Sequence, residues 1–173
     1  MGLFSNIVDR VFKTKSNSNM KDAINNTKDL LNSARYSIKI VSGCLYNEFY
    51  QDGGIAEILN SIKEKNKDIK ITIICGPEID EKTHYVQELA KAGKLNLYIS
   101  ENYPEKHFIL VDNKMVRAET FHKAEKLTNT RATFFYDSIF LAKRLAIEFG
   151  KLRDSSKLFG SDEEKPKAAA GGK

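Results

Sequence analysis

Several side chains that can exchange protons or bind metal ions occur within residues 105–122. Glu105 and His107 precede an apolar run that ends on Asp112, and Glu119 and His122 follow it. In an extended strand Glu105 and His107 share one face, because side chains alternate with a period of two. Imidazoles with carboxylates can act as acid and base or can ligate a transition metal. All five residues are therefore candidates for a catalytic site, and their types alone do not assign a role to any one of them.

The same residues admit several interpretations, of which we favour a hydrogen-bonded network of ions. The second is a pocket for a ligand or a phosphate, lined by Glu105, His107, Glu119, Thr120 and His122. Catalysis by His107 or His122 stays open as a third. A metal site is disfavoured because the spacing matches no compact metal-binding motif, so we expect no metal and no cofactor.

Asp112 begins the sequence Asp-Asn-Lys, which predicts a tight turn between two strands. A structural role in this turn is favoured over a chemical one for Asp112. The third histidine, His84, falls near the start of a predicted helix and is expected to be a surface side chain. Basic residues also cluster around the turn and the loop after it, and we interpret them as a solvated face: Lys114, Arg117, Lys123, Lys126 and Arg131.

Alternating helical and extended patterns must position these residues. Apolar residues at helical spacing predict helices over 20–34, 55–65, 82–92 and 137–153, the last capped by Asp137. Strands are predicted over 36–41, 69–75, 95–99, 107–111, 115–119 and 132–136, with a polar loop over 120–131. This order predicts an α/β layered domain with a mixed β-sheet and helices on both faces.

The two ends of the chain differ from this central domain. Residues 2–13 repeat apolar side chains at helical spacing and predict an amphipathic helix, and the polar residues 14–19 predict a hinge. Residues 1–18 are thus separated from a domain over 19–159, and a disordered tail is predicted over 160–173. The N-terminal helix has three candidate contacts: its own domain, another subunit or a membrane interface.

The composition limits the class of protein. The chain has 173 residues, 41% of them hydrophobic, which fits one domain with a sizeable core. No secretory signal is predicted from the sequence, and no apolar run in it is long enough to span a bilayer. Two isolated cysteines, Cys44 and Cys75, predict reduced thiols and a cytoplasmic location, with a membrane-peripheral location as an alternative. The net charge of +5 permits weak attraction to phosphates, so nucleic acid is a weakly supported partner.

Residues 19–155 resemble one phospholipase D-like domain. That family carries the signature His-x-Lys-x4-Asp, then six residues, Gly-Ser or Gly-Gly, one residue and Asn. With Asp112 as anchor, the spacing fits without a gap, but Glu105 stands at the His position, His107 at the Lys position and His122 at the Asn position. The Gly-Ser pair is Glu119-Thr120. The family's closing helix is matched by Ala142, Leu145, Phe149 and Leu152.

The resemblance implies a site made from two facing copies of the signature, one histidine attacking phosphorus and the other protonating the leaving oxygen. A chain with one copy would therefore have to form a homodimer or a larger oligomer. The substitutions replace the nucleophile and the phosphate-binding lysine, and a carboxylate repels a phosphodiester. We therefore predict a catalytically degenerate phospholipase D-like domain that acts as a self-associating binding or scaffold module.

Two alternatives remain. One is an active phosphodiesterase, of nuclease or phospholipase type, that uses a rearranged pair of histidines across a homodimer. The other is a nucleic-acid binding protein without catalysis.

Overall fold

The computed structural model describes residues 14–16, 19–45, 47–50, 54–77, 84–119 and 132–160. The predicted helix over 2–13, the loop 120–131 and the tail from residue 161 onward lie outside the described residues. Among the described helices, none is both long and apolar enough to cross a membrane.

Helices and strands alternate from residue 14 to residue 99, apart from two consecutive helices. The elements are β1 Thr14–Ser16, α2 Met20–Asn32, β2 Ser37–Val41, α3 Asn47–Tyr50, α4 Ile55–Lys65, β3 Lys70–Cys75, α5 His84–Lys91, β4 Asn96–Ile99, β5 Phe108–Val111, β6 Met115–Glu119, β7 Ala132–Phe135, α6 Ile139–Asp154 and β8 Lys157–Leu158. Within the described ranges, eight strands form a single sheet in the order β1-β7-β6-β5-β2-β3-β4-β8. The strands β2, β3 and β4 are parallel, and the other pairings are antiparallel. The predicted mixed α/β sheet is confirmed.

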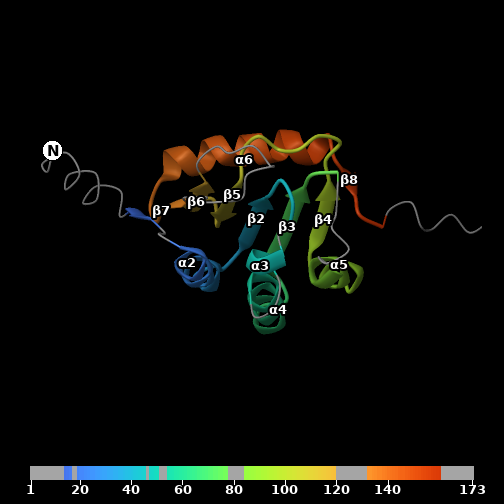
Figure 1. Ribbon diagram of the computed structural model, residues 1–173, viewed down its shortest axis with the longest axis horizontal. Helices are drawn as coiled ribbons and strands as arrows, with labels where there is room; N and C mark the ends of the chain where they lie inside the picture. Colours follow the sequence, from blue (N-terminus) through green and yellow to red (C-terminus); the bar gives the residue numbers. More distant parts are fainter. Residues whose placement is uncertain are drawn as a thin grey trace, which may run out of the picture.

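The sheet lies between two helical layers (Figure 1). The helix α6 runs along one face, and α2, α4 and α5 cover the opposite face. Alternation along the central strands supplies both cores: Ile38 and Ile40 of β2 pack toward α2 and α4, whereas Val41 packs in the cluster that contains α6. Burial on both faces explains why the central strands are almost continuously apolar.

The helix α6 is held to the sheet by one narrow apolar stripe. Ala142, Leu145 and Phe149 are buried at helical spacing, and Leu152 is partly buried in the same cluster. The closing-helix residues singled out in the sequence therefore face the sheet together.

Three local expectations were wrong. Thr14–Ser16 are not a hinge but the edge strand β1, antiparallel to β7, because backbone pairing at a sheet edge requires no apolar side chains. The short strand β8 was missed for the same reason, since both of its residues are exposed. Asp137 does not cap α6, because the N-cap residue of that helix is Ser138. Asp137 instead forms an ion pair with Lys114 at 3.3 Å.

The turn between β5 and β6 anchors the hairpin to the start of β2. Asp112 and Asn113 have φ of 51° and 53°, the left-handed region that Asp and Asn tolerate better than most residues. The Asp112 carboxylate accepts hydrogen bonds from the backbone N–H groups of Arg35, Tyr36 and Ser37, each at 2.8 Å. The carboxylate is thus the acceptor for three backbone N–H groups in the connection between α2 and β2. Asp112 therefore forms the predicted turn and also links it to a segment distant in sequence.

We expect Asp112→Ala to lower the free energy of unfolding by about 3 kcal/mol, because three N–H groups lose a charged acceptor. Urea denaturation followed by circular dichroism measures this change. Asn113→Ala is the matched control: it also places alanine at positive φ but removes only a contact to Lys39, and should cost about 1 kcal/mol. Equal losses in the two variants would show that backbone strain, not the carboxylate, accounts for the effect.

Candidate functional site

The candidate site forms where the carboxyl ends of the parallel strands meet the hairpin. Ser42 and Gly43 follow β2, and Gly76 follows β3, with the Gly76 N–H bonded to the Gly43 carbonyl at 2.9 Å. His107 precedes β5, which is antiparallel to β2, and Glu119 ends β6. The Glu119 N–H donates to the His107 carbonyl at 3.0 Å, so both residues lie at this edge. Open α/β sheets bind ligands at the carboxyl ends of their parallel strands.

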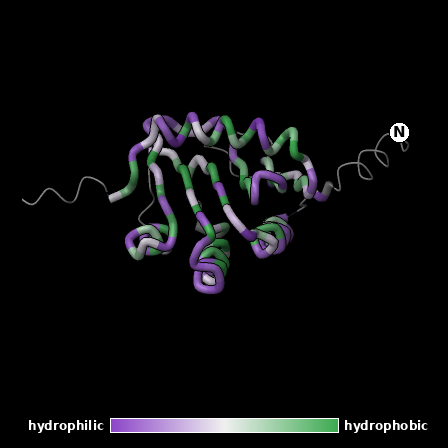
Figure 2. Tube along the Cα trace, turned by 180° about the vertical axis from the view of Figure 1, so that it is seen from behind, coloured by the Kyte–Doolittle hydropathy of each residue, from purple (hydrophilic) through white to green (hydrophobic). Residues whose placement is uncertain are grey.

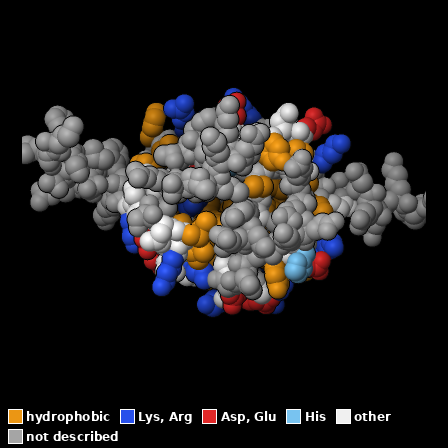
Figure 3. All heavy atoms as spheres, in the orientation of Figure 1, with side chains coloured by type: hydrophobic (Ala, Val, Ile, Leu, Met, Phe, Trp, Pro, Cys, Tyr) orange, Lys and Arg blue, Asp and Glu red, His pale blue; other side chains and the backbone are white. Residues whose placement is uncertain are grey.

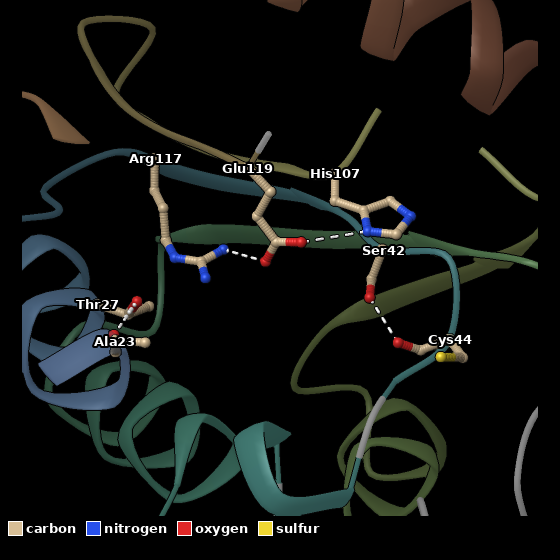
Figure 4. A network of polar contacts seen from close by, with 7 residues as sticks. All are labelled: Ala23, Thr27, Ser42, Cys44, His107, Arg117 and Glu119. Carbon is tan, nitrogen blue, oxygen red and sulfur yellow. Dashed lines mark hydrogen bonds and ion pairs between the residues drawn. The ribbon is translucent and has the colours of Figure 1, made fainter. Parts of the chain in front are cut away.

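A single carboxylate joins an imidazole to a buried guanidinium (Figure 4). Glu119 Oε2 lies 3.2 Å from His107 Nδ1, and Glu119 Oε1 accepts from Arg117 Nη1 at 2.5 Å. Arg117 and Glu119 share a face of β6 because they are two residues apart. The Arg117 side chain is only 4% exposed, and those of His107 and Glu119 are 13% and 16% exposed. An ionised carboxylate only accepts hydrogen bonds, so His107 donates through Nδ1.

Aromatic rings complete the surroundings of the Arg117 guanidinium. Its central carbon lies 4.8 Å from the ring centroid of Phe49 and 5.9 Å from that of Phe134, which are cation–π distances. The Arg117 Nε atom is buried and has no hydrogen-bond partner among the described residues. The cation is thus stabilised by Glu119 and by aromatic faces.

Two further polar groups near this edge are held in their neutral forms. Burial raises the pKa of Tyr50, and a hydrogen bond to Ser42 and nearby Arg117 oppose that shift only in part. The Ser42 hydroxyl in turn donates to the Cys44 carbonyl at 2.7 Å. Burial, with a smaller effect of Cys44, raises the pKa of the Cys75 thiol to about 12, so it is not a ready nucleophile.

Glycine at position 43 determines how closely the His107 ring can approach the sheet. A Cβ atom at Gly43 would lie 2.6 Å from His107 Nε2. At Gly76 it would lie 2.4 Å from the Gly43 carbonyl oxygen and 2.5 Å from a ring carbon of Tyr103. Both glycines are therefore required for the close contacts between strand ends and rings.

The structure brings together only part of the predicted set. His107 and Glu119 are in direct contact, as the favoured ion network requires. Glu105 is exposed and makes no hydrogen bond or ion pair with another described residue. Asp112 lies at the opposite end of the hairpin, in the turn. Thr120 and His122 lie outside the described residues.

The prediction made for Arg117 from the sequence was wrong, and other residues of the site were not predicted. Arg117 was grouped with the solvated basic face, yet it is 3% exposed. Its position two residues before Glu119 in a strand was the signal that could have identified it. No sequence pattern identified Tyr50, Ser42 and Gly43 as site residues. Their contacts depend on the conformation of the connections after the strands. His84 is exposed as expected and stacks on Tyr85 at 4.3 Å.

No group of three potential metal ligands occurs within the described ranges. The arrangement supplies an oriented imidazole and a cation that is already paired with a carboxylate.

We expect Gly43→Ala to displace the His107 ring and break its contact with Glu119, because the added methyl overlaps Nε2. Imidazole nitrogen chemical shifts in NMR spectra report the change, and the free energy of unfolding should fall by about 1–3 kcal/mol.

Gly150→Ala is the control, since a Cβ there meets nothing within 4 Å and should stabilise α6 by about 0.5–1 kcal/mol. Unchanged His107 shifts in Gly43→Ala would contradict the close packing described above.

Glu119→Gln should destabilise the fold by about 3 kcal/mol, because it leaves the buried Arg117 guanidinium without a counter-charge. Glu148→Gln removes the same charge from an exposed pair with Lys106 and should cost under about 1 kcal/mol. Denaturant titration compares the two variants. A similar small loss in both would mean that Arg117 does not depend on Glu119.

Comparison with known proteins identifies the fold. No family model matches the sequence, and no curated protein matches it. Among solved structures, the phospholipase D family member Nuc from Salmonella typhimurium aligns with a TM-score of 0.67 at 17% identity, covering 84% of this chain and 97% of Nuc. NucT from Helicobacter pylori aligns with a TM-score of 0.67 at 18% identity, covering 86% and 99%. The fold is therefore phospholipase D-like.

Two larger proteins contain the same fold as a part. TrmBL2, an archaeal chromatin protein described with a novel mode of DNA binding, aligns with a TM-score of 0.63 at 15% identity. The phosphatidylserine synthase of Haemophilus influenzae Rd KW20 aligns with a TM-score of 0.57 at 12% identity. The alignments cover 83% and 84% of this chain but 53% and 39% of those chains. The likeness in all four cases concerns the fold alone.

Proposed function

We propose that this phospholipase D-like domain binds a partner or ligand at the carboxyl edge of its sheet without cleaving phosphodiesters. The observation that carries the proposal is the position of Glu119, whose carboxylate contacts both His107 and Arg117. A site that stabilises a phosphoryl transition state needs cations and donors directed at the phosphate oxygens. Here the buried cation is already neutralised.

The residues at the signature positions support the same proposal. Glu105, at the nucleophile position, is exposed and carries no imidazole. His107, at the lysine position, has its Nδ1 atom 3.2 Å from the Glu119 carboxylate. A phosphodiester entering this edge would meet a negative charge from Glu119 before it met the guanidinium of Arg117.

Self-association is part of the proposal, because a phospholipase D-like site implies two facing copies of the signature and this chain has one. The carboxyl edge that holds His107 and Glu119 is then the surface at which copies meet. Light scattering after size exclusion measures the mass, and a monomer at all accessible concentrations would remove this part of the proposal.

We expect no hydrolysis of bis-(p-nitrophenyl) phosphate or of single-stranded DNA above the rate in buffer, with or without EDTA. His107→Ala should leave that background unchanged, and Lys21→Ala, at an exposed position of α2, is a control for contaminating nucleases. Turnover that is lost in His107→Ala and kept in Lys21→Ala would establish the active phosphodiesterase instead.

Nucleic-acid binding without catalysis is a second candidate, favoured by the likeness of the fold to a DNA-binding chromatin protein. It predicts that single- or double-stranded DNA is retarded in a gel and that added salt weakens the retention. Retention that does not depend on salt, or no retention, speaks against it.

A further inference from the structure

The helix α6 exposes a mixed apolar and basic surface to solvent. Phe140 is 84% exposed and Ile147 is 65% exposed. Lys143, Arg144 and Lys151 are exposed as well. Their spacing of three, four, seven and eleven residues from Phe140 puts all five side chains on one side of the helix, opposite the buried stripe. We call these five residues the α6 outer face.

The cations of the α6 outer face are not neutralised within the described part of the chain. Lys143, Arg144 and Lys151 form no ion pair there, whereas Glu148, the acidic residue in this stretch, already pairs with Lys106 at 2.9 Å. Figure 3 shows hydrophobic and basic side chains next to each other at one end of the edge that α6 occupies, and acidic side chains elsewhere along that edge. Seen from behind in Figure 2, hydrophilic and hydrophobic residues alternate along the same helix.

Two large apolar side chains between unpaired cations are complementary to the surface of an anionic bilayer. At the interface of an anionic bilayer, aromatic and aliphatic groups enter the headgroup region while lysine and arginine contact lipid phosphates and carboxylates. A helix that lies flat along one face of the molecule can place Phe140 and Ile147, two turns apart, at the same depth.

The N-terminal segment attaches to the fold at the same end of α6. Thr14 is paired with Phe135, which precedes the first residue of α6 by only four positions. Residues 2–13 carry their own apolar repeat together with Arg10 and Lys13. The described chain that follows these residues, β1, thus pairs with β7 close to the start of α6.

We propose that the α6 outer face is a docking surface for a lipid bilayer that contains anionic lipids. Phe140 and Ile147 enter the interface, and Lys143, Arg144 and Lys151 bind the headgroups. The inference concerns the helix on one face of the sheet and does not depend on the function proposed for the carboxyl edge.

Flotation of the full chain with vesicles tests the proposal. The protein should float with vesicles of phosphatidylcholine containing one-third phosphatidylserine and not with phosphatidylcholine alone. Replacing Lys143, Arg144 and Lys151 by glutamine should weaken the binding about a hundredfold, at about 1 kcal/mol for each charge. Phe140→Ser with Ile147→Ser should weaken it about tenfold or more. Both sets of side chains are exposed, so melting temperatures should not change.

The control variant combines Lys21→Gln, Lys65→Gln and Lys67→Gln. These exposed residues lie on α2, at the end of α4 and just after it, so the same charge is removed on the other side of the sheet from α6. The control variant should bind vesicles within about twofold of the unaltered chain, because these residues face away from α6. If the control variant and the α6 glutamine variant lost vesicle binding equally, the binding would depend only on net charge, and the proposal would be overturned.

Two other outcomes would also overturn it. If the unaltered chain binds no anionic vesicles and the Phe140/Ile147 variant turns an oligomer into a monomer in light scattering, the α6 outer face is a contact between copies. If the glutamine variant loses DNA retention while vesicle binding is absent throughout, the face serves nucleic acid.

Discussion

The carboxylate of Glu119 is the group on which the candidate site depends. It compensates the charge of Arg117, which would otherwise be a cation buried among Phe49 and Phe134, and it fixes the orientation of the His107 ring. Isolated charges are costly in a protein interior, so removing this carboxylate would leave the guanidinium without a counter-charge. The same pairing that stabilises this edge of the sheet also consumes the positive charge that a bound phosphate would require.

The residues that determine this phospholipase D-like fold are not the residues of the proposed binding edge. The fold depends on apolar alternation in the central strands, on the stripe of α6 and on the Asp112 anchor. None of these involves the residues at the nucleophile and lysine positions. Structures with 17% or 18% sequence identity therefore share the sheet without any requirement that they share a reaction.

The sequence predicted elements in which apolar residues repeat at helical or strand spacing. It did not predict contacts that depend on the conformation of loops. Ile38 and Ile40 are buried on one face of β2 and Val41 on the other, as in a strand between two helical layers, so the sheet and both layers could be predicted. The contact between His107 and Glu119 followed from hairpin register. Arg117 was misread because arginine is usually exposed, and the aromatic rings that bury it come from α3 and β7, which no local pattern connects with β6.

The two ends of the sheet limit how copies of this protein can combine. The strand β1 has three residues, all polar or charged, and β8 has only two, Lys157 and Leu158. Such short terminal strands offer few backbone groups to an incoming chain. Continuous sheets across molecules, and the fibres that grow from them, are therefore disfavoured.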